Sequence, residues 1–262
     1  MDHVEVSPVP MIFRRMVRDL EFDVAEMAFA TYIVAKYFEK PFTALPIFLT
    51  RSFYHGSLLC RAESSFKSPL ELEGKRIGVR SYTFTPGVWT RGIMKTEYGV
   101  NLDSITWVLS GDEHVVEFKA PSNVVSSPTG DLEKMLLSGE VDAVIGAGSL
   151  DHQRTRPIFS DHFGLDATWF GKTGIYPISH VLVVKDSLVE CDDSLIKEIY
   201  RVFNDAKESY VRVLETKHPL TTDDLNVLRI RDIVPSDPLP YGLDGDREGI
   251  KVFISFCVDQ NL

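Results

Sequence analysis

Two short stretches of this sequence combine residue types that could bind an organic acid and move a proton. Residues 51–56 read Arg-Ser-Phe-Tyr-His-Gly, and residues 80–85 read Arg-Ser-Tyr-Thr-Phe-Thr. The arginine in each stretch could hold a carboxylate through paired hydrogen bonds, and a histidine could deliver a proton near neutral pH. His114 and His180 add two more candidate proton donors. For any one histidine, a structural role in the core is the alternative interpretation.

Other kinds of catalytic site are not indicated. No His-x-His, His-Glu-x-x-His or Cys-x-x-Cys spacing occurs, so we expect no cofactor, although a metal held by residues far apart in the chain stays open. The Gly-x-Ser-x-Gly pattern of serine hydrolases is also absent. Residues 146–148, Gly-Ala-Gly, follow an apolar run but lack the rest of a dinucleotide-binding pattern, so we interpret them as a tight turn.

The composition narrows the class of protein. The 262 residues are 44% hydrophobic and 25% charged, which is typical of a globular chain long enough for two compact lobes. A net charge of -10 disfavours nucleic acid as a partner, and no run of 18 apolar residues predicts a membrane span. Three scattered cysteines predict no disulfide framework, and the N-terminal residues lack a secretory pattern, so we expect a cytoplasmic location.

The second stretch lies at a predicted junction between a strand and a helix. Residues 76–79 form a short apolar run that is typical of a buried parallel strand. Thr85 and Pro86 then predict the N-cap and first residue of a helix that ends near Gly99. A helix that begins there would direct free backbone N–H groups and a partial positive charge toward the end of the strand. That position favours a carboxylate, sulfonate or phosphate.

Strand and helix patterns alternate along the rest of the chain. Apolar runs predict strands at 22–27, 42–49, 105–109, 141–145 and 181–184, with helices between them and a long amphipathic helix from Asp192 through 214. This alternation predicts a parallel sheet with crossover helices. Val4 and Val6 alternate like a strand, whereas residues 149–172 are interpreted as loop-rich. Glu26 falls near the end of its strand, where it could meet a ligand or remain a solvated carboxylate.

Several stretches taken together resemble the 4,5-dihydroxyphthalate decarboxylase family. The similarity runs across most of the chain in the same order, at residues 22–28, 51–56, 72–80, 82–89, 97–100, 105–108 and 174–180. This resemblance implies an α/β fold like that of the type II periplasmic binding proteins, with two lobes and a ligand cleft between them. It places residues 1–74 and 173–262 in lobe one and residues 75–172 in lobe two. The family pattern also includes a strand before the equivalent of Val4, which this sequence starts without, and a short tail after the equivalent of Leu262.

The resemblance also implies an activity. We expect non-oxidative decarboxylation of a hydroxylated aromatic acid, with 4,5-dihydroxyphthalate converted to 3,4-dihydroxybenzoate (protocatechuate) and CO2. This lyase reaction needs an acid over the ring carbon that carries the carboxylate, and a group that contacts the ring hydroxyls. We assign the acid to His180, with His55 as the reserve, and the hydroxyl contact to Glu26.

Six residues are expected to bind the substrate: Arg51, Arg80, Tyr82, Thr83, Thr85 and Trp89. The arginines and the helix start would hold the carboxylates, while the aromatic side chains would flank the ring. For Trp89, a place in the core is the alternative. The expected partner is a small aromatic carboxylate, and a homo-oligomer stays open. Two other functions also stay open: a non-catalytic solute-binding protein for a small aromatic or anionic ligand, and an inactive relative.

Overall fold

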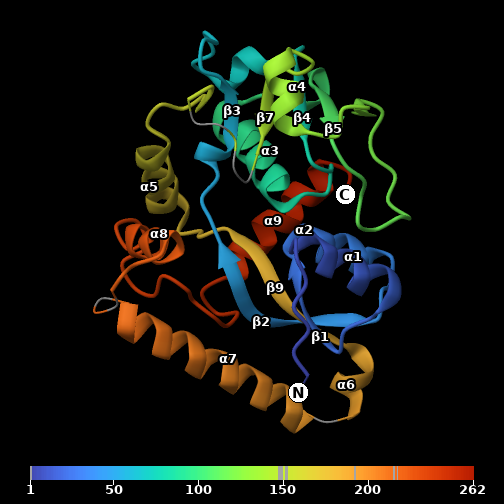
Figure 1. Cartoon of the computed structure of the whole chain (residues 1–262), viewed down its shortest axis with the longest axis vertical. Coiled ribbons are helices and arrows are strands. Elements are labelled where there is room, and N and C mark those ends of the chain that lie inside the picture. The colour runs from blue at the N-terminus through green and yellow to red at the C-terminus, as the bar shows by residue number, and fades with distance from the viewer. Residues whose placement is uncertain (1, 147–149, 151–152, 192, 215, 217) are drawn as a thin grey trace. The chain divides into compact units, whose positions relative to one another are not determined.

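The chain folds into two compact units, described here from a computed structural model of residues 2–146, 150, 153–191, 193–214, 216 and 218–262 (Figure 1). The first unit contains residues 1–52 and 170–249, and the second contains residues 53–169 and 250–262. The lobes expected from the family resemblance place residues 53–74 and 250–262 in lobe one and residues 170–172 in lobe two. Residues 53–74 belong to the second unit because the strand at Leu58–Arg61 pairs with two strands of that unit's sheet.

The first unit is built on a three-stranded antiparallel sheet in the order β1-β9-β2. Its strands are β1 (Val24–Ala28), β2 (Phe42–Arg51) and β9 (Ile178–Lys185), and its helices are α1 (Pro10–Asp19), α2 (Phe29–Tyr37), α6 (Asp186–Cys191), α7 (Asp193–Leu214) and α8 (Thr222–Ile230). The predicted parallel sheet is therefore wrong for this unit. The two strands that flank α2 do run parallel to each other, but β9 comes from much later in the chain and lies between them in the opposite direction.

The long amphipathic helix α7 is confirmed, and its apolar side covers this sheet. Ile199 is buried in one cluster with Leu45 and Leu182, and Leu195 and Phe203 pack against that cluster. The predicted cap of this helix includes Asp192, which lies outside the described residues. The expected strand at Val4 and Val6 is not formed, because this segment pairs with no strand of the described chain.

The second unit is built on a six-stranded sheet in the order β6-β5-β4-β7-β3-β8. The strands are β3 (Leu58–Arg61), β4 (Arg76–Val79), β5 (Thr106–Leu109), β6 (Val124–Ser126), β7 (Ala143–Ile145) and β8 (Thr155–Pro157). The four strands β4 to β7 are parallel, which confirms the crossover prediction for this unit. The strand β3 runs in the opposite direction and pairs with β7 on one side and β8 on the other. The remaining helices are α3 (Thr85–Tyr98), α4 (Leu132–Ser138), α5 (His162–Thr173) and α9 (Arg247–Asp259).

One local prediction in this region is wrong. Residues 149–172 are not loop-rich, because they include β8 and most of α5. The helix pattern of α5 is weak, since Gly164 and Gly171 interrupt it and only Asp166 and Trp169 are buried. The predicted turn at 146–148 lies largely outside the described residues.

The helix α3 begins one residue away from its predicted cap. Phe84 is the N-cap, and Thr85 is the first residue of the helix. The Thr85 side chain has no exposed surface. The predicted end is confirmed, since Gly99 adopts a left-handed conformation with φ of 71°. Inside the second unit, α3 packs on the C-terminal segment, where the Trp89 ring lies 4.8 Å from that of Phe253. None of the helices in the described part of the chain is long and apolar enough to cross a membrane.

Candidate functional site

His180 and Glu26 form a pair on neighbouring strands of the first unit. His180 on β9 lies opposite Ala28 of β1, and Glu26 lies two residues before Ala28. Because side chains two residues apart point to the same face of a strand, this register puts the two side chains on one face as diagonal neighbours. The His180 Nδ1 atom is 2.6 Å from Glu26 Oε1, and the side chains are 25% and 24% exposed. The structure therefore brings together the two residues predicted as acid and hydroxyl partner.

This pair has the arrangement of an oriented acid–base group. An ionised Glu26 accepts the Nδ1 proton, which fixes the tautomer and leaves Nε2 as the ring nitrogen that can exchange a proton with a ligand. The Phe13 ring of α1 meets the His180 ring edge-on with centroids 5.0 Å apart, so the imidazole is held on one side by an aromatic contact. The pair can thus hold a proton in a defined direction while remaining accessible.

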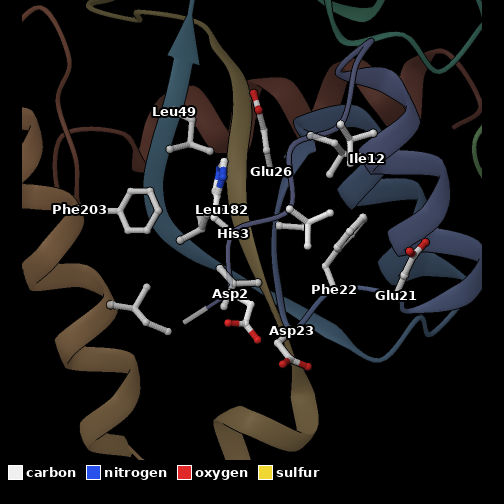
Figure 2. A pocket seen from close by; sticks show the side chains of 15 residues that line it. Asp2, His3, Ile12, Glu21, Phe22, Asp23, Glu26, Leu49, Leu182 and Phe203 are labelled. Atoms are coloured by element: carbon white, nitrogen blue, oxygen red, sulfur yellow. The ribbon is translucent and has the colours of Figure 1, made fainter.

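A pocket of about 620 Å³ in the first unit is lined by Glu26 of this pair, whereas His180 is not among its lining residues (Figure 2). Glu26 lies toward one end of it and Asp2 and Asp23 lie toward the other in this view, with His3 between them. The walls between them are largely apolar, from Val4, Val6, Ile12, Phe22, Val24, Ala25, Leu49, Leu182, Ile199 and Phe203. Carboxylates outnumber cationic groups in this lining, so the pocket suits an apolar group better than an anionic one.

The second predicted group lies in the second unit, at the loop between β4 and α3. The Arg80 Nη2 atom is 2.7 Å from His114 Nε2. The backbone N–H groups of Tyr82 and Thr83 donate to the carboxylate of Glu113, and the Thr83 hydroxyl donates to the same carboxylate. The predicted anion-binding position at this strand end therefore does hold a carboxylate, and it belongs to the chain itself.

The aromatic and hydroxyl residues of this loop are mostly covered. Tyr82 is buried, and its ring stacks on Phe118 with centroids 6.4 Å apart. Burial raises the pKa of the Tyr82 hydroxyl, and the nearby Arg91 cation partly opposes that rise. Trp89 has no exposed surface, so the structure favours the alternative that it belongs to the core.

Arg51 and His55 are both occupied by buried partners. Arg51 forms a two-point ion pair with Asp246, at 2.8 Å and 2.5 Å, and also donates to the backbone oxygens of Tyr176 and Pro240. Its side chain has no exposed surface. His55 Nδ1 lies 2.6 Å from Asp166, and both side chains are buried. These contacts favour structural roles over the predicted carboxylate binding and reserve acid function.

Sequence reasoning did not identify the acidic partners Glu113, Asp166 and Asp246. Glu113 follows β5, the parallel neighbour of β4, so the rule that ligand groups gather at the carboxyl ends of parallel strands could have found it. Asp246 pairs with a residue 195 positions away, and no pattern in the sequence indicates that pairing. Within the residues that the structure describes, no cluster of three or more histidine, cysteine or acidic side chains could hold a metal ion.

Solved structures of low sequence identity share this fold. A crystal structure of an Archaeoglobus fulgidus protein is 14% identical with a TM-score of 0.59, over 99% of this chain and 86% of that one. A periplasmic sulfonate-binding protein from Methylobacillus flagellatus is 10% identical with a TM-score of 0.53, over 97% and 73%. The desulfurization enzyme DszB is 14% identical with a TM-score of 0.53, over 92% and 80%. The predicted α/β fold of the periplasmic binding proteins is therefore confirmed.

Sequence comparison gives a more specific result, although no family model matches the chain. A 4,5-dihydroxyphthalate decarboxylase from Comamonas testosteroni is 33% identical over 210 residues, which are 75% of this chain and 64% of that protein. A 4,5-dihydroxyphthalate decarboxylase from Pseudomonas putida is 32% identical over 173 residues, 61% of this chain and 67% of that protein. The chain thus spans about two thirds of the length of these curated relatives. At this identity and coverage, the chain belongs to the 4,5-dihydroxyphthalate decarboxylase family.

Proposed function

We propose that this protein catalyses the non-oxidative decarboxylation of a hydroxylated aromatic acid, with 4,5-dihydroxyphthalate as the substrate and 3,4-dihydroxybenzoate and CO2 as products. The names of the two curated relatives support this substrate. The observation that carries the proposal is the His180–Glu26 pair, because a histidine held by a carboxylate can serve as the acid that this reaction needs.

The reaction begins with protonation of the ring. His180 Nε2 donates a proton to the ring carbon that bears the leaving carboxylate, and the hydroxyl para to that carbon stabilises the cationic ring by releasing electron density. The bond between the ring and the carboxylate then breaks, its electron pair restores the aromatic ring, and CO2 leaves. One proton thereby replaces one CO2, and His180 regains its proton from solvent. Glu26 holds the imidazole throughout and stabilises its protonated form.

Within the second unit taken by itself, the loop between β4 and α3 is proposed as a carboxylate-binding element. Arg80 supplies a cation, and the peptide groups of Tyr82 and Thr83 already donate to a carboxylate in this structure. We withdraw Arg51 and His55 from the proposed site, because buried carboxylates already bind the two terminal nitrogens of Arg51 and the Nδ1 atom of His55. Thr85 and Trp89 are also withdrawn as direct contacts, since neither has exposed surface.

The experiment is CO2 release from 4,5-dihydroxyphthalate by the purified protein and three variants. His180→Ala should lower turnover by about 100-fold or more, and Glu26→Gln should lower it by about 10-fold or more because it leaves the imidazole without its anionic partner. His218→Ala removes an exposed histidine and should retain turnover. Near-normal turnover in His180→Ala would remove this residue from the acid role.

A binding protein is the second candidate function, favoured by the fold shared with a sulfonate-binding protein. The same preparations can distinguish it. A ligand-dependent rise in melting temperature without CO2 release would support a binding protein. CO2 release above the protein-free control would support the decarboxylase.

A further inference from the structure

In the second unit, three hydrogen-bond donors converge on one carboxylate, that of Glu113. Glu113 accepts hydrogen bonds from the backbone N–H groups of Tyr82 and Thr83 and from the Thr83 hydroxyl. These donors follow β4 directly and precede the first turn of α3, so the positive end of that helix also favours an anion here. Three converging donors on one carboxylate form a charge-assisted arrangement that does not depend on where the carboxylate comes from.

The opposite side of the same peptide group is held by a buried cation. Arg91 has no exposed surface, and its Nη2 atom donates to the Tyr82 carbonyl oxygen at 2.6 Å. Its guanidinium also lies 4.1 Å from the centre of the Tyr82 ring, and its Nε atom donates to Gln260 at 2.6 Å. The peptide between Tyr82 and Thr83 is therefore polarised, with a cation on its carbonyl side and an anion on its N–H side.

One nitrogen of this arginine makes no hydrogen bond within the described residues. Among the described residues, Arg91 Nη1 is buried and has no hydrogen-bond partner. It faces the first turn of α3, where a Cβ atom built on Gly87 would lie 3.1 Å from it. Burial lowers the pKa of Arg91, and the nearby Glu113 carboxylate opposes that shift. The Arg91 guanidinium, with one hydrogen-bonding nitrogen unpaired, thus lies on the carbonyl side of the peptide whose N–H group donates to Glu113.

We propose that the Tyr82–Thr83 peptide and the Thr83 hydroxyl form a binding site for a ligand carboxylate, and that Glu113 is its built-in occupant. A carboxylate of the aromatic substrate binds there by displacing Glu113, and the buried Arg91 provides part of the attraction. This inference rests on the proposed function for the class of ligand. Beyond the proposed function, the inference names the hydrogen-bond donors for the ligand carboxylate. It also names Glu113 as an internal competitor that weakens ligand binding.

The competition has a measurable consequence. A tethered carboxylate competes with a free one, so the apparent dissociation constant equals the intrinsic one divided by the fraction of molecules in which Glu113 has left the site. Removing the Glu113 side chain should therefore strengthen ligand binding. Loss of an ordinary structural carboxylate would instead leave binding unchanged or weaken it.

The test is calorimetric titration of the full chain with phthalate, a benzene dicarboxylate without hydroxyl groups. Glu113→Ala should bind phthalate about 10-fold more tightly than the unmodified protein. Asp112→Ala removes an exposed carboxylate from the same loop and should change the dissociation constant by less than about 2-fold, which controls for net charge. Thr83→Val, placed in the Glu113→Ala background, should weaken phthalate binding by about 5-fold because one donor is lost.

Unchanged or weaker phthalate binding in Glu113→Ala would overturn the proposal, and so would an equal gain in Asp112→Ala. If Glu113→Ala does not fold, Glu113→Gln removes the charge with little change of shape and should also bind phthalate more tightly. The readout is binding, so it is independent of turnover. A protein that releases no CO2 but shows the Glu113 effect keeps this inference and loses the proposed function, whereas CO2 release without the effect does the reverse.

Discussion

At the scale of single residues, the two arginines predicted to bind carboxylates differ in what their guanidinium groups contact. Arg80 lies beside His114 at a strand end, whereas Arg51 meets Asp246 and two backbone oxygens inside the first unit. A guanidinium that is already bound at two points by a buried carboxylate cannot take up a second one without breaking that pair. The type of residue was informative, but the partner decides its role.

This difference predicts a stability effect for Arg51. Arg51→Ala leaves Asp246 as a buried charge without its partner, so the free energy of unfolding should fall by about 3–5 kcal/mol in urea denaturation. The double variant Arg51→Ala with Asp246→Ala should lose clearly less than the sum of the two single losses. Arg201→Ala disrupts an exposed cluster with Glu198 and Asp205 and should change stability little. A native-like unfolding curve for Arg51→Ala would contradict the structural role.

Some of the candidate site residues could be predicted from the sequence, but their acidic partners could not. The strand-end rule located Glu26 and Arg80, because alternation and strand ends are local properties of the sequence. The predicted helix start at Thr85 suggested a nearby anion, and the structure has a carboxylate just before that helix, on the peptide groups of Tyr82 and Thr83. The source of that carboxylate was not predictable in the same way. Which acid pairs with which cation depends on the packing of segments far apart in the chain.

At the scale of elements, strand register explains the candidate pair. The antiparallel alignment of β1 with β9 sets His180 opposite Ala28, and this alignment alone decides that His180 meets Glu26. The sequence predicted both strands but not their direction. A chain that inserts a late strand between two early ones gives the same hydrophobic pattern as a parallel sheet, so periodicity cannot separate the two.

Helix packing inside the second unit provides another prediction. A Cβ atom at Gly92 of α3 would lie 2.0 Å from the Phe256 ring of α9, so Gly92 permits the close approach of the two helices. Gly92→Ala should therefore lower the free energy of unfolding by about 1–3 kcal/mol, despite the better helix propensity of alanine.

A second glycine serves as the matched control for this change. Gly171 lies in α5 with open space around its Cα atom, so Gly171→Ala should leave stability unchanged or raise it by up to about 1 kcal/mol. Phe256→Leu in the Gly92→Ala background should recover part of the loss. Urea denaturation of the unmodified chain, the two single glycine variants and the double variant measures these changes in the free energy of unfolding. A Gly92→Ala variant as stable as the unmodified chain would show that α9 can shift away from α3 at little cost.

At the scale of the whole molecule, buried phenol and thiol groups predict how stability depends on pH. Burial raises the pKa of Tyr176 to about 12 and that of Cys257 to about 12, while nearby arginines partly oppose these shifts. Groups with a raised pKa in the folded state stabilise the fold while they are neutral. That contribution is complete below the unfolded-state pKa and is lost as the pH rises through the folded-state value.

The free energy of unfolding should therefore fall from about pH 9, where an unfolded thiol ionises, to about pH 12, and Tyr176 alone should account for about 2 kcal/mol of the loss at pH 12. Tyr176→Phe keeps the ring but cannot ionise, so its stability should decline less steeply over this range. Urea denaturation at pH 8, 10, 11 and 12 measures the slope. Parallel curves for the two proteins would mean that the Tyr176 hydroxyl ionises at the same pH in the folded and unfolded chain.

The division of each unit into two separate pieces of chain also constrains its synthesis. Residues 53–169 leave the ribosome well before residues 250–262, yet Trp89 needs Phe253 and Phe256 to cover it, and Arg91 needs Gln260. The first unit likewise waits for residues 170–249 to supply β9 between β1 and β2. The nascent chain thus carries two incomplete cores at once, so assembly of either unit is coupled to translation of about the last third of the sequence.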